Sequence, residues 1–130
     1  MTAVRPFLMF EGRAQEAMDF YTSLFADGEI LEVKRYGAEG SGPEGSVVVA
    51  SFRIAGQEVM CSDSPVKHAF TFTPSMSLFV TCDSDEEIRR LAAALDAGEK
   101  QFMPLGSYGF STLFAWVQDQ FGVSWQINLP

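Results

Sequence analysis

Apolar positions recur at helical spacing in two segments of the chain and alternate with polar positions through much of the rest. The first helical segment is residues 13–25, where an apolar stripe predicts one buried face. The second is residues 84–97, which Ser84 and Glu87 open as a capping box and Gly98 ends. The remaining periodic segments predict strands at residues 4–10, 30–36, 46–54, 57–62, 75–82, 100–104, 111–118 and 123–129.

These elements repeat in the same order, so that each half of the chain reads strand, helix, strand, strand, strand. When the two halves are aligned, Gly56, in the turn before the last strand of the first half, matches Gly122, in the turn before the last strand of the second half. Neither half can bury both faces of its sheet alone. We therefore predict an α+β fold with two βαβββ modules, at about residues 4–64 and 75–130, forming a curved mixed sheet around a cup. The helices lie on the convex side, and residues 1–130 form a single domain.

Side-chain alternation divides each strand between the helix side and the cup side. In the last strand Trp125 and Ile127 belong to the apolar set that packs on the helices, which leaves Gln126 toward the cup. Repeat symmetry extends this division to the other strands. Together, alternation and symmetry give eight candidate ligand-binding residues: Phe7, Met9, Glu58, Met60, Ser77, Phe79, Trp116 and Gln126. Trp116 is a candidate either for the cup or for a dimer seam. Such a lining suits a small organic molecule, because apolar area supplies affinity and a few polar groups fix the orientation.

Four residues with reactive side chains have competing interpretations. Glu58 is either a general base in an apolar surrounding or a solvated carboxylate at the exposed end of its strand. We interpret His68 as a solvent-exposed loop residue rather than an acid or base in a lid over the cup. Cys61 and Cys82 fall on the helix side of their strands, which favours buried structural thiols over nucleophiles.

Composition narrows the range of partners. Seventeen Asp and Glu against nine Lys and Arg give a net charge of −8, which disfavours binding to nucleic acid and to acidic membrane surfaces. No apolar run approaches the roughly 20 residues that span a bilayer, and residues 1–6 lack the pattern of a signal peptide. The two cysteines are too few for a disulfide scaffold, which fits a reducing compartment. We therefore expect a cytoplasmic protein.

Four short motifs carry a resemblance to a known family. They are residues 10–12 (FEG), 16–21 (EAMDFY), 62–64 (SDS) and 119–127 (DQFGVSWQI). In this order they make the sequence similar to the vicinal oxygen chelate superfamily of glyoxalases, bleomycin-resistance proteins and dioxygenases. Within it, the sequence most resembles the PhnB-like branch, often labelled 3-demethylubiquinone-9 3-methyltransferase. The resemblance implies paired βαβββ modules and a homodimer.

The same resemblance bears on metal binding. Metal-dependent members hold a divalent ion with His and Glu side chains from the first, fourth, fifth and eighth strands. The matching positions here are Phe7, Met60, Ser77 and Gln126, and none of these is a histidine or a carboxylate. We therefore expect no metal site and predict no cofactor, with a divalent metal as the alternative.

The resemblance and the residues lead to one function and three alternatives. We expect a protein that binds a small organic molecule in its cup without metal, either sequestering it or transforming it by an acid–base step, and assign no catalytic residue. The first alternative is a metal-dependent lyase, isomerase or dioxygenase with ligands from Glu58, Gln126 and His68. The second is an interaction module whose cup is closed by Phe and Met side chains. The third, methyl transfer, is disfavoured because no glycine-rich loop joins a strand to a helix.

Overall fold

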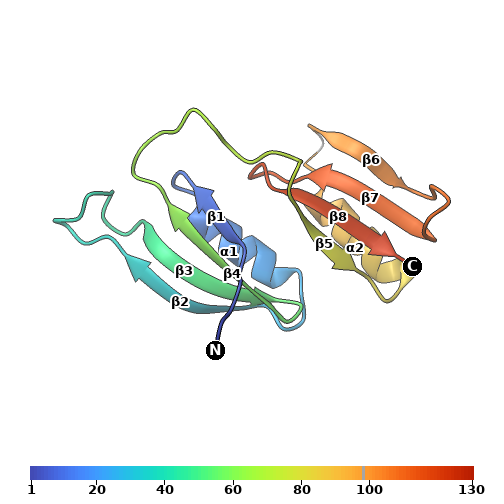
Figure 1. The fold of residues 1–130 in the computed structure, drawn as a ribbon, viewed down its shortest axis with the longest axis horizontal. Helices are drawn as coiled ribbons and strands as arrows, with labels where there is room; N and C mark the ends of the chain where they lie inside the picture. Colours follow the sequence, from blue (N-terminus) through green and yellow to red (C-terminus); the bar gives the residue numbers. More distant parts are fainter. Residues whose placement is uncertain (98) are drawn as a thin grey trace. The chain divides into compact units, whose positions relative to one another are not determined.

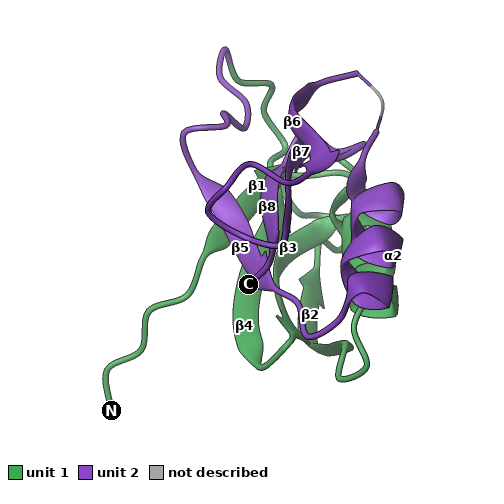
Figure 2. Cartoon of the chain, turned by 90° about the vertical axis from the view of Figure 1, so that its right-hand side faces the viewer, with its two compact units in different colours: residues 1–68 green, residues 69–130 purple. Residues whose placement is uncertain are grey.

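The computed structural model describes residues 1–97 and 99–130, so that the helix stop predicted at Gly98 lies outside the described residues. The chain divides into two compact units, residues 1–68 and 69–130 (Figure 2). They contain the predicted modules at residues 4–64 and 75–130. The grouping of both units into a single domain stays a prediction.

Unit 1 has the order β-α-β-β-β (Figure 1). Its elements are β1 (Phe7–Phe10), α1 (Ala14–Ser23), β2 (Glu29–Arg35), β3 (Val47–Ile54) and β4 (Gln57–Asp63). The sheet order is β1-β4-β3-β2, in which β1 runs parallel to β4 and the other neighbouring pairs are antiparallel.

Unit 2 repeats this architecture. Its elements are β5 (Ser77–Thr81), α2 (Asp85–Leu95), β6 (Gln101–Gly106), β7 (Leu113–Gln118) and β8 (Ser124–Leu129). The sheet order is β5-β8-β7-β6, with β5 parallel to β8. The predicted pair of βαβββ modules is therefore confirmed, as two mixed four-stranded sheets. The joining of the two sheets around a shared cup stays a prediction.

Both helices end two residues earlier than the apolar pattern predicts. At the end of α1, Leu24 donates to the Tyr21 carbonyl at 3.1 Å, an i→i−3 bond that tightens the last turn. After α2, Asp96 is extended and the amide of Ala97 donates to the carbonyl of Gln118 in β7 at 3.3 Å. Tertiary hydrogen bonds thus decide where α2 stops. The predicted capping box is present, with the Ser84 hydroxyl accepting from the Glu87 amide at 3.1 Å.

One face of each sheet packs on the helix of its own unit. In unit 1 the buried face of α1 includes Met18 and Tyr21, whose ring lies 6.0 Å from that of Phe52 in β3. In unit 2 the buried face of α2 includes Leu91, and the strands supply the fully buried Trp125. Among the described residues, no helix is long and apolar enough to cross a membrane.

The other face of each sheet is free of its helix, and we call these the open faces of unit 1 and unit 2. Alternation and the strand registers define them. The open face of unit 1 consists of Phe7, Met9, Glu29, Glu32, Lys34, Val49, Ser51, Arg53, Glu58, Met60 and Ser62. The open face of unit 2 consists of Ser77, Phe79, Thr81, Phe114, Trp116, Gln118, Ser124, Gln126 and Asn128.

Candidate functional site

All eight candidate residues lie on the open faces, four in each unit. Unit 1 carries Phe7, Met9, Glu58 and Met60. Unit 2 carries Ser77, Phe79, Trp116 and Gln126. The side chains next to them along each strand point to the helix side, as the burial of Leu8, Val59 and Trp125 shows. The eight side chains therefore lie on the faces opposite the helices, and their contact with a ligand stays a prediction.

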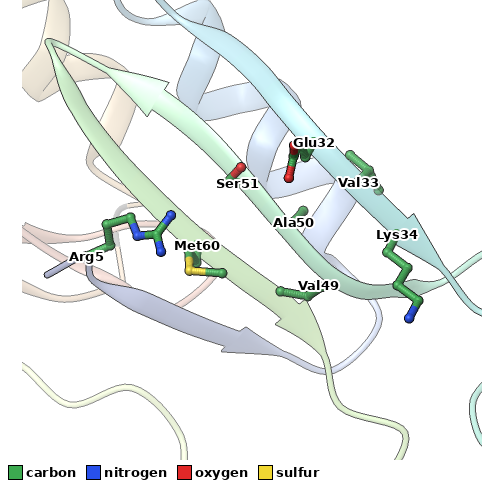
Figure 3. A pocket seen from close by; sticks show the side chains of 8 residues that line it. All are labelled: Arg5, Glu32, Val33, Lys34, Val49, Ala50, Ser51 and Met60. Atoms are coloured by element: carbon green, nitrogen blue, oxygen red, sulfur yellow. The ribbon is translucent and has the colours of Figure 1, made fainter. Parts of the chain in front are cut away.

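The open face of unit 1 has a hollow of about 510 Å³ (Figure 3). Its lining comes from the segment before β1 and from β2, β3 and β4: Arg5, Glu32, Val33, Lys34, Val49, Ala50, Ser51 and Met60. Met60 and Arg5 reach over the same side of the sheet, and Lys34 extends from β2 at the far edge. The lining thus combines apolar side chains with a few polar ones, as small-molecule sites usually do.

Glu58 lies beside Arg5, one of the residues that line the hollow. Its carboxylate is 2.6 Å from the Arg5 guanidinium, and the two side chains are 37% and 38% exposed. Its direct partner in the neighbouring strand β3 is Arg53, which forms an ion pair with Glu29 at 2.7 Å. These surroundings are those of a solvated, ion-paired carboxylate rather than of a base in an apolar pocket, so that the structure favours the second interpretation of Glu58.

The open face of unit 2 holds a chain of four hydrogen-bonded side chains. The indole nitrogen of Trp116 donates to the Ser124 hydroxyl at 2.9 Å, and that hydroxyl lies 2.7 Å from the Ser77 hydroxyl. The amide nitrogen of Gln126 donates to Ser77 at 3.3 Å. Because the bonds join β5, β7 and β8, the chain fixes the polar groups of this face relative to one another.

Aromatic side chains surround this polar chain. Phe102 lies 4.9 Å from Trp116 between ring centroids, and Phe79 lies 6.3 Å from Phe114. Phe110 packs on Phe114 from the loop before β7, at 5.0 Å. Phe79 is still 59% exposed. The open face of unit 2 therefore offers a ring surface to a molecule from outside.

The positions that match the family's metal ligands carry a donor set that does not fit a divalent metal. Phe7 and Met60 are partners in the β1–β4 pair, and they offer a phenyl ring and a thioether. In unit 2 the partner of Gln126 is Phe79, and Ser77 lies two residues away and is hydrogen-bonded to Gln126. Within residues 1–97 and 99–130, no three His, Cys, Asp or Glu side chains come together as a metal-binding group.

Two buried carboxylates have structural roles that the sequence motifs did not reveal. Asp63 accepts from the amides of Gly12, Ala14 and Val47 at 2.9 to 3.0 Å. Asp119 accepts from three N–H groups between Phe121 and Trp125. Both lie inside the family-like motifs. A lone Asp at the end of an apolar strand is the sequence signal that could have identified Asp63.

The remaining reactive residues serve the fold. His68 is half-buried rather than solvent-exposed, because its Nε2 lies 2.8 Å from the Ser64 hydroxyl and its amide donates to Glu11. Cys61 and Cys82 are buried free thiols, as predicted. Burial raises the pKa of the Cys61 thiol to about 12 and that of Cys82 to about 11. The site chemistry therefore rests on the open faces.

Comparisons with known proteins agree with this fold. The model of the family described as 3-demethylubiquinone-9 3-methyltransferase matches residues 2–128. Protein YjdN of Escherichia coli (strain K12) is 29% identical over 137 residues, covering 95% of this chain and 92% of YjdN.

Solved structures extend the likeness to three dimensions. A PhnB protein from Bacillus cereus is 53% identical with a TM-score of 0.95, covering 99% of this chain and 100% of its own. A glyoxylase/bleomycin resistance protein/dioxygenase domain from Frankia sp. EAN1pec is 14% identical with a TM-score of 0.65, covering 99% of this chain and 92% of its own. The second likeness is one of fold alone.

Proposed function

We propose that this chain, which belongs to the 3-demethylubiquinone-9 3-methyltransferase family and has the PhnB-like vicinal oxygen chelate fold, binds a small organic molecule without a metal ion. The observation that carries the proposal is the hollow of about 510 Å³ on the open face of unit 1. A hollow of this size falls in the range of small-molecule sites, roughly 300–1,000 Å³.

The chemistry of the hollow supports binding rather than catalysis. Met60 and Val49 supply apolar surface, while Arg5 and Lys34 supply positive charge. The nearby carboxylate of Glu58 is engaged with Arg5. The lining also includes the carboxylate of Glu32. We assign no catalytic residue.

Methyl transfer, which the family description names, is not part of the proposal. Enzymes that bind S-adenosylmethionine in the common fold use a glycine-rich turn between a parallel strand and a helix. Here the β1–α1 turn is Glu11-Gly12-Arg13, and the β5–α2 turn has no glycine. The segment with Gly40 and Gly42 connects β2 to β3, which are antiparallel.

Metal analysis separates the proposal from a metal-dependent enzyme of the same superfamily. Protein purified without chelator is measured for divalent metals by mass spectrometry, and its melting temperature is measured with and without EDTA. We expect substoichiometric metal and an unchanged melting temperature, because the donor set at Phe7, Met60, Ser77 and Gln126 is poor. A stoichiometric metal ion would contradict the proposal.

Native mass spectrometry tests ligand binding directly. We expect protein purified from its source cells to carry an additional small mass that is lost on denaturation. Met60→Arg fills the hollow and should abolish this mass, whereas Met76→Arg makes the same change at an exposed position before β5. A bound mass that survives Met60→Arg, or none in any preparation, would count against the hollow as the site.

Two further expectations stay predictions. We propose that the chain forms a homodimer, which analytical ultracentrifugation tests by mass. We also propose a cytoplasmic location, which fractionation of the source cells tests.

A further inference from the structure

We infer that the open face of unit 2 binds an uncharged aromatic molecule through Gln126 and the rings of Phe79 and Trp116. This assignment goes beyond the proposed function: it adds a binding face in unit 2 and names the chemical class of ligand that this face takes. It is carried by three features of unit 2: the distribution of charge, the register of its strands and the hydrogen bonds of its polar side chains.

Charge is almost absent from the strands of unit 2. In residues 69–82 and 101–130, Asp119 is the sole charged side chain in the sequence. It is 3% exposed and accepts from the Trp125 indole at 2.8 Å, so that it does not act on the open face. An ionic ligand on this face would lose hydration without gaining a counter-charge, which is costly.

The open face of unit 1, in contrast to that of unit 2, carries several charged side chains. It carries Glu32, Lys34, Arg53 and Glu58, with Arg5 at its edge. The two modules share one topology, yet their open faces differ in charge. The two faces therefore suit different chemical groups, and an uncharged group fits unit 2.

The strand register places the amide of Gln126 between two aromatic residues. Gln126 is the direct partner of Phe79 in β5 and of Trp116 in β7. Adjacent strands lie about 4.8 Å apart, so the two aromatic residues are separated by about 10 Å across the amide. A flat ring above Gln126 could contact both, and aromatic pairs of this kind contribute about 0.5–1.5 kcal/mol beyond burial of area.

Counting hydrogen bonds identifies the polar group of the ligand. Either hydroxyl of the Ser77–Ser124 pair can be the donor and Ser124 is 2% exposed, so the donor for a ligand comes from Gln126 rather than from this pair. Gln126 spends one amide hydrogen on Ser77, which leaves its second amide hydrogen and its carbonyl oxygen without a partner in the described part of the chain. The face therefore presents a neutral donor and a neutral acceptor. A ring with a carboxamide or a similar neutral donor–acceptor group complements them.

Three matched probes test the assignment: benzamide, benzoate, which adds a negative charge, and cyclohexanecarboxamide, which removes the flat ring. The full chain, labelled with ¹⁵N, is titrated with each while the side-chain signals of Gln126 and Trp116 are followed by NMR. The buried indole of Trp125 is the internal control. We expect benzamide to shift the first two signals saturably, and the other two probes to bind about tenfold more weakly.

Variants assign the effect to the amide. Gln126→Leu should weaken benzamide binding about tenfold, because it removes one or two neutral hydrogen bonds. Gln57→Leu makes the same change in unit 1 and should leave the affinity unchanged. A melting temperature close to that of the unsubstituted protein shows that each variant is folded.

The outcomes distinguish this assignment from the proposed function. Benzoate binding as tightly as benzamide, or full affinity in Gln126→Leu, would overturn the uncharged aromatic class. If no probe shifts the signals but native mass spectrometry still finds a bound small molecule, the class is wrong and the proposed function stands. If neither experiment finds binding, both fail.

Discussion

Asp119 accepts a hydrogen bond from the indole nitrogen of Trp125 at 2.8 Å, although both side chains are buried. The other carboxylate oxygen accepts from the amides of Phe121 and Val123. One side chain thus shapes the β7–β8 turn and anchors the largest ring of the unit 2 core. This explains why an acidic residue lies in an otherwise uncharged stretch of the chain.

We therefore predict that Asp119→Ala destabilises the protein strongly. Three donors lose their acceptor, and the free energy of unfolding should fall by about 3 kcal/mol. Denaturant titration followed by tryptophan fluorescence measures it. Asp19→Ala, at an exposed position on α1, is the control and should change stability by less than about 0.5 kcal/mol. Equal effects of the two substitutions would contradict the role of Asp119.

Asp63 is predicted to have the same importance in unit 1. In Asp63→Asn the remaining side-chain oxygen still accepts from the amides of Gly12 and Ala14. The side-chain NH₂ then takes the place of the oxygen that accepts from the Val47 amide, so that two donors face each other. The clash of two donors should cost about 2 kcal/mol. Hydrogen exchange should accelerate most at Val47, and an unchanged exchange rate there would show that the second oxygen is dispensable.

Acid should weaken the β3–β4 hairpin. The backbone amides of Gly56 and Ala55 donate to Asp27 at 2.8 and 2.7 Å, and these bonds, chiefly that from Gly56, lower the pKa of Asp27. A lowered pKa in the folded state gives stability that is present above the unfolded pKa, about 3.9, and is lost as the pH falls through the folded value.

The Asp27 carboxyl signal, followed by NMR against pH, should titrate below that of an unstructured aspartate. Asp27→Asn should remove its share of the acid dependence of stability. An unshifted titration would contradict the contacts with the turn, where Ala55 and Gly56 both have positive φ.

Both thiols should resist alkylation in the folded protein. Cys61 and Cys82 are buried, with pKa values raised to about 12 and about 11, so that little thiolate forms at pH 8. Iodoacetamide should label neither cysteine in the native state and both in guanidinium chloride, as counted by mass spectrometry. Rapid labelling of either cysteine in the native protein would place it outside the core.

The periodic pattern predicts much of this fold because burial and periodicity are linked. Leu8 and Phe10 are buried, whereas Phe7, on the open face of the same strand, is 52% exposed, as the alternation predicts. What the pattern misses depends on distant partners. The Arg5–Glu58 pair joins residues 53 positions apart, and Asp63 bonds to Gly12 from 51 positions away. No local window contains both members of such a pair.

The candidate site shows the same division. Alternation assigns Gln126 and Phe79 to the open face, but their direct pairing in β5 and β8 depends on the register. The hydrogen bonds from Gln126 through Ser77 and Ser124 to Trp116 also require three strands in place. The sequence therefore assigns these residues to one face of the sheet, and the fold determines how they are connected.

Pro104 lies in β6, the outer strand of its sheet. Proline has no N–H to donate, and an outer strand tolerates this loss because it pairs with a neighbour, β7, on one side alone. The β6–β7 ladder is also irregular on either side of Met103. A strand from another molecule that approached this edge would meet a lost donor and a distorted backbone. The chain is thus protected at this border against edge-to-edge aggregation and fibril growth.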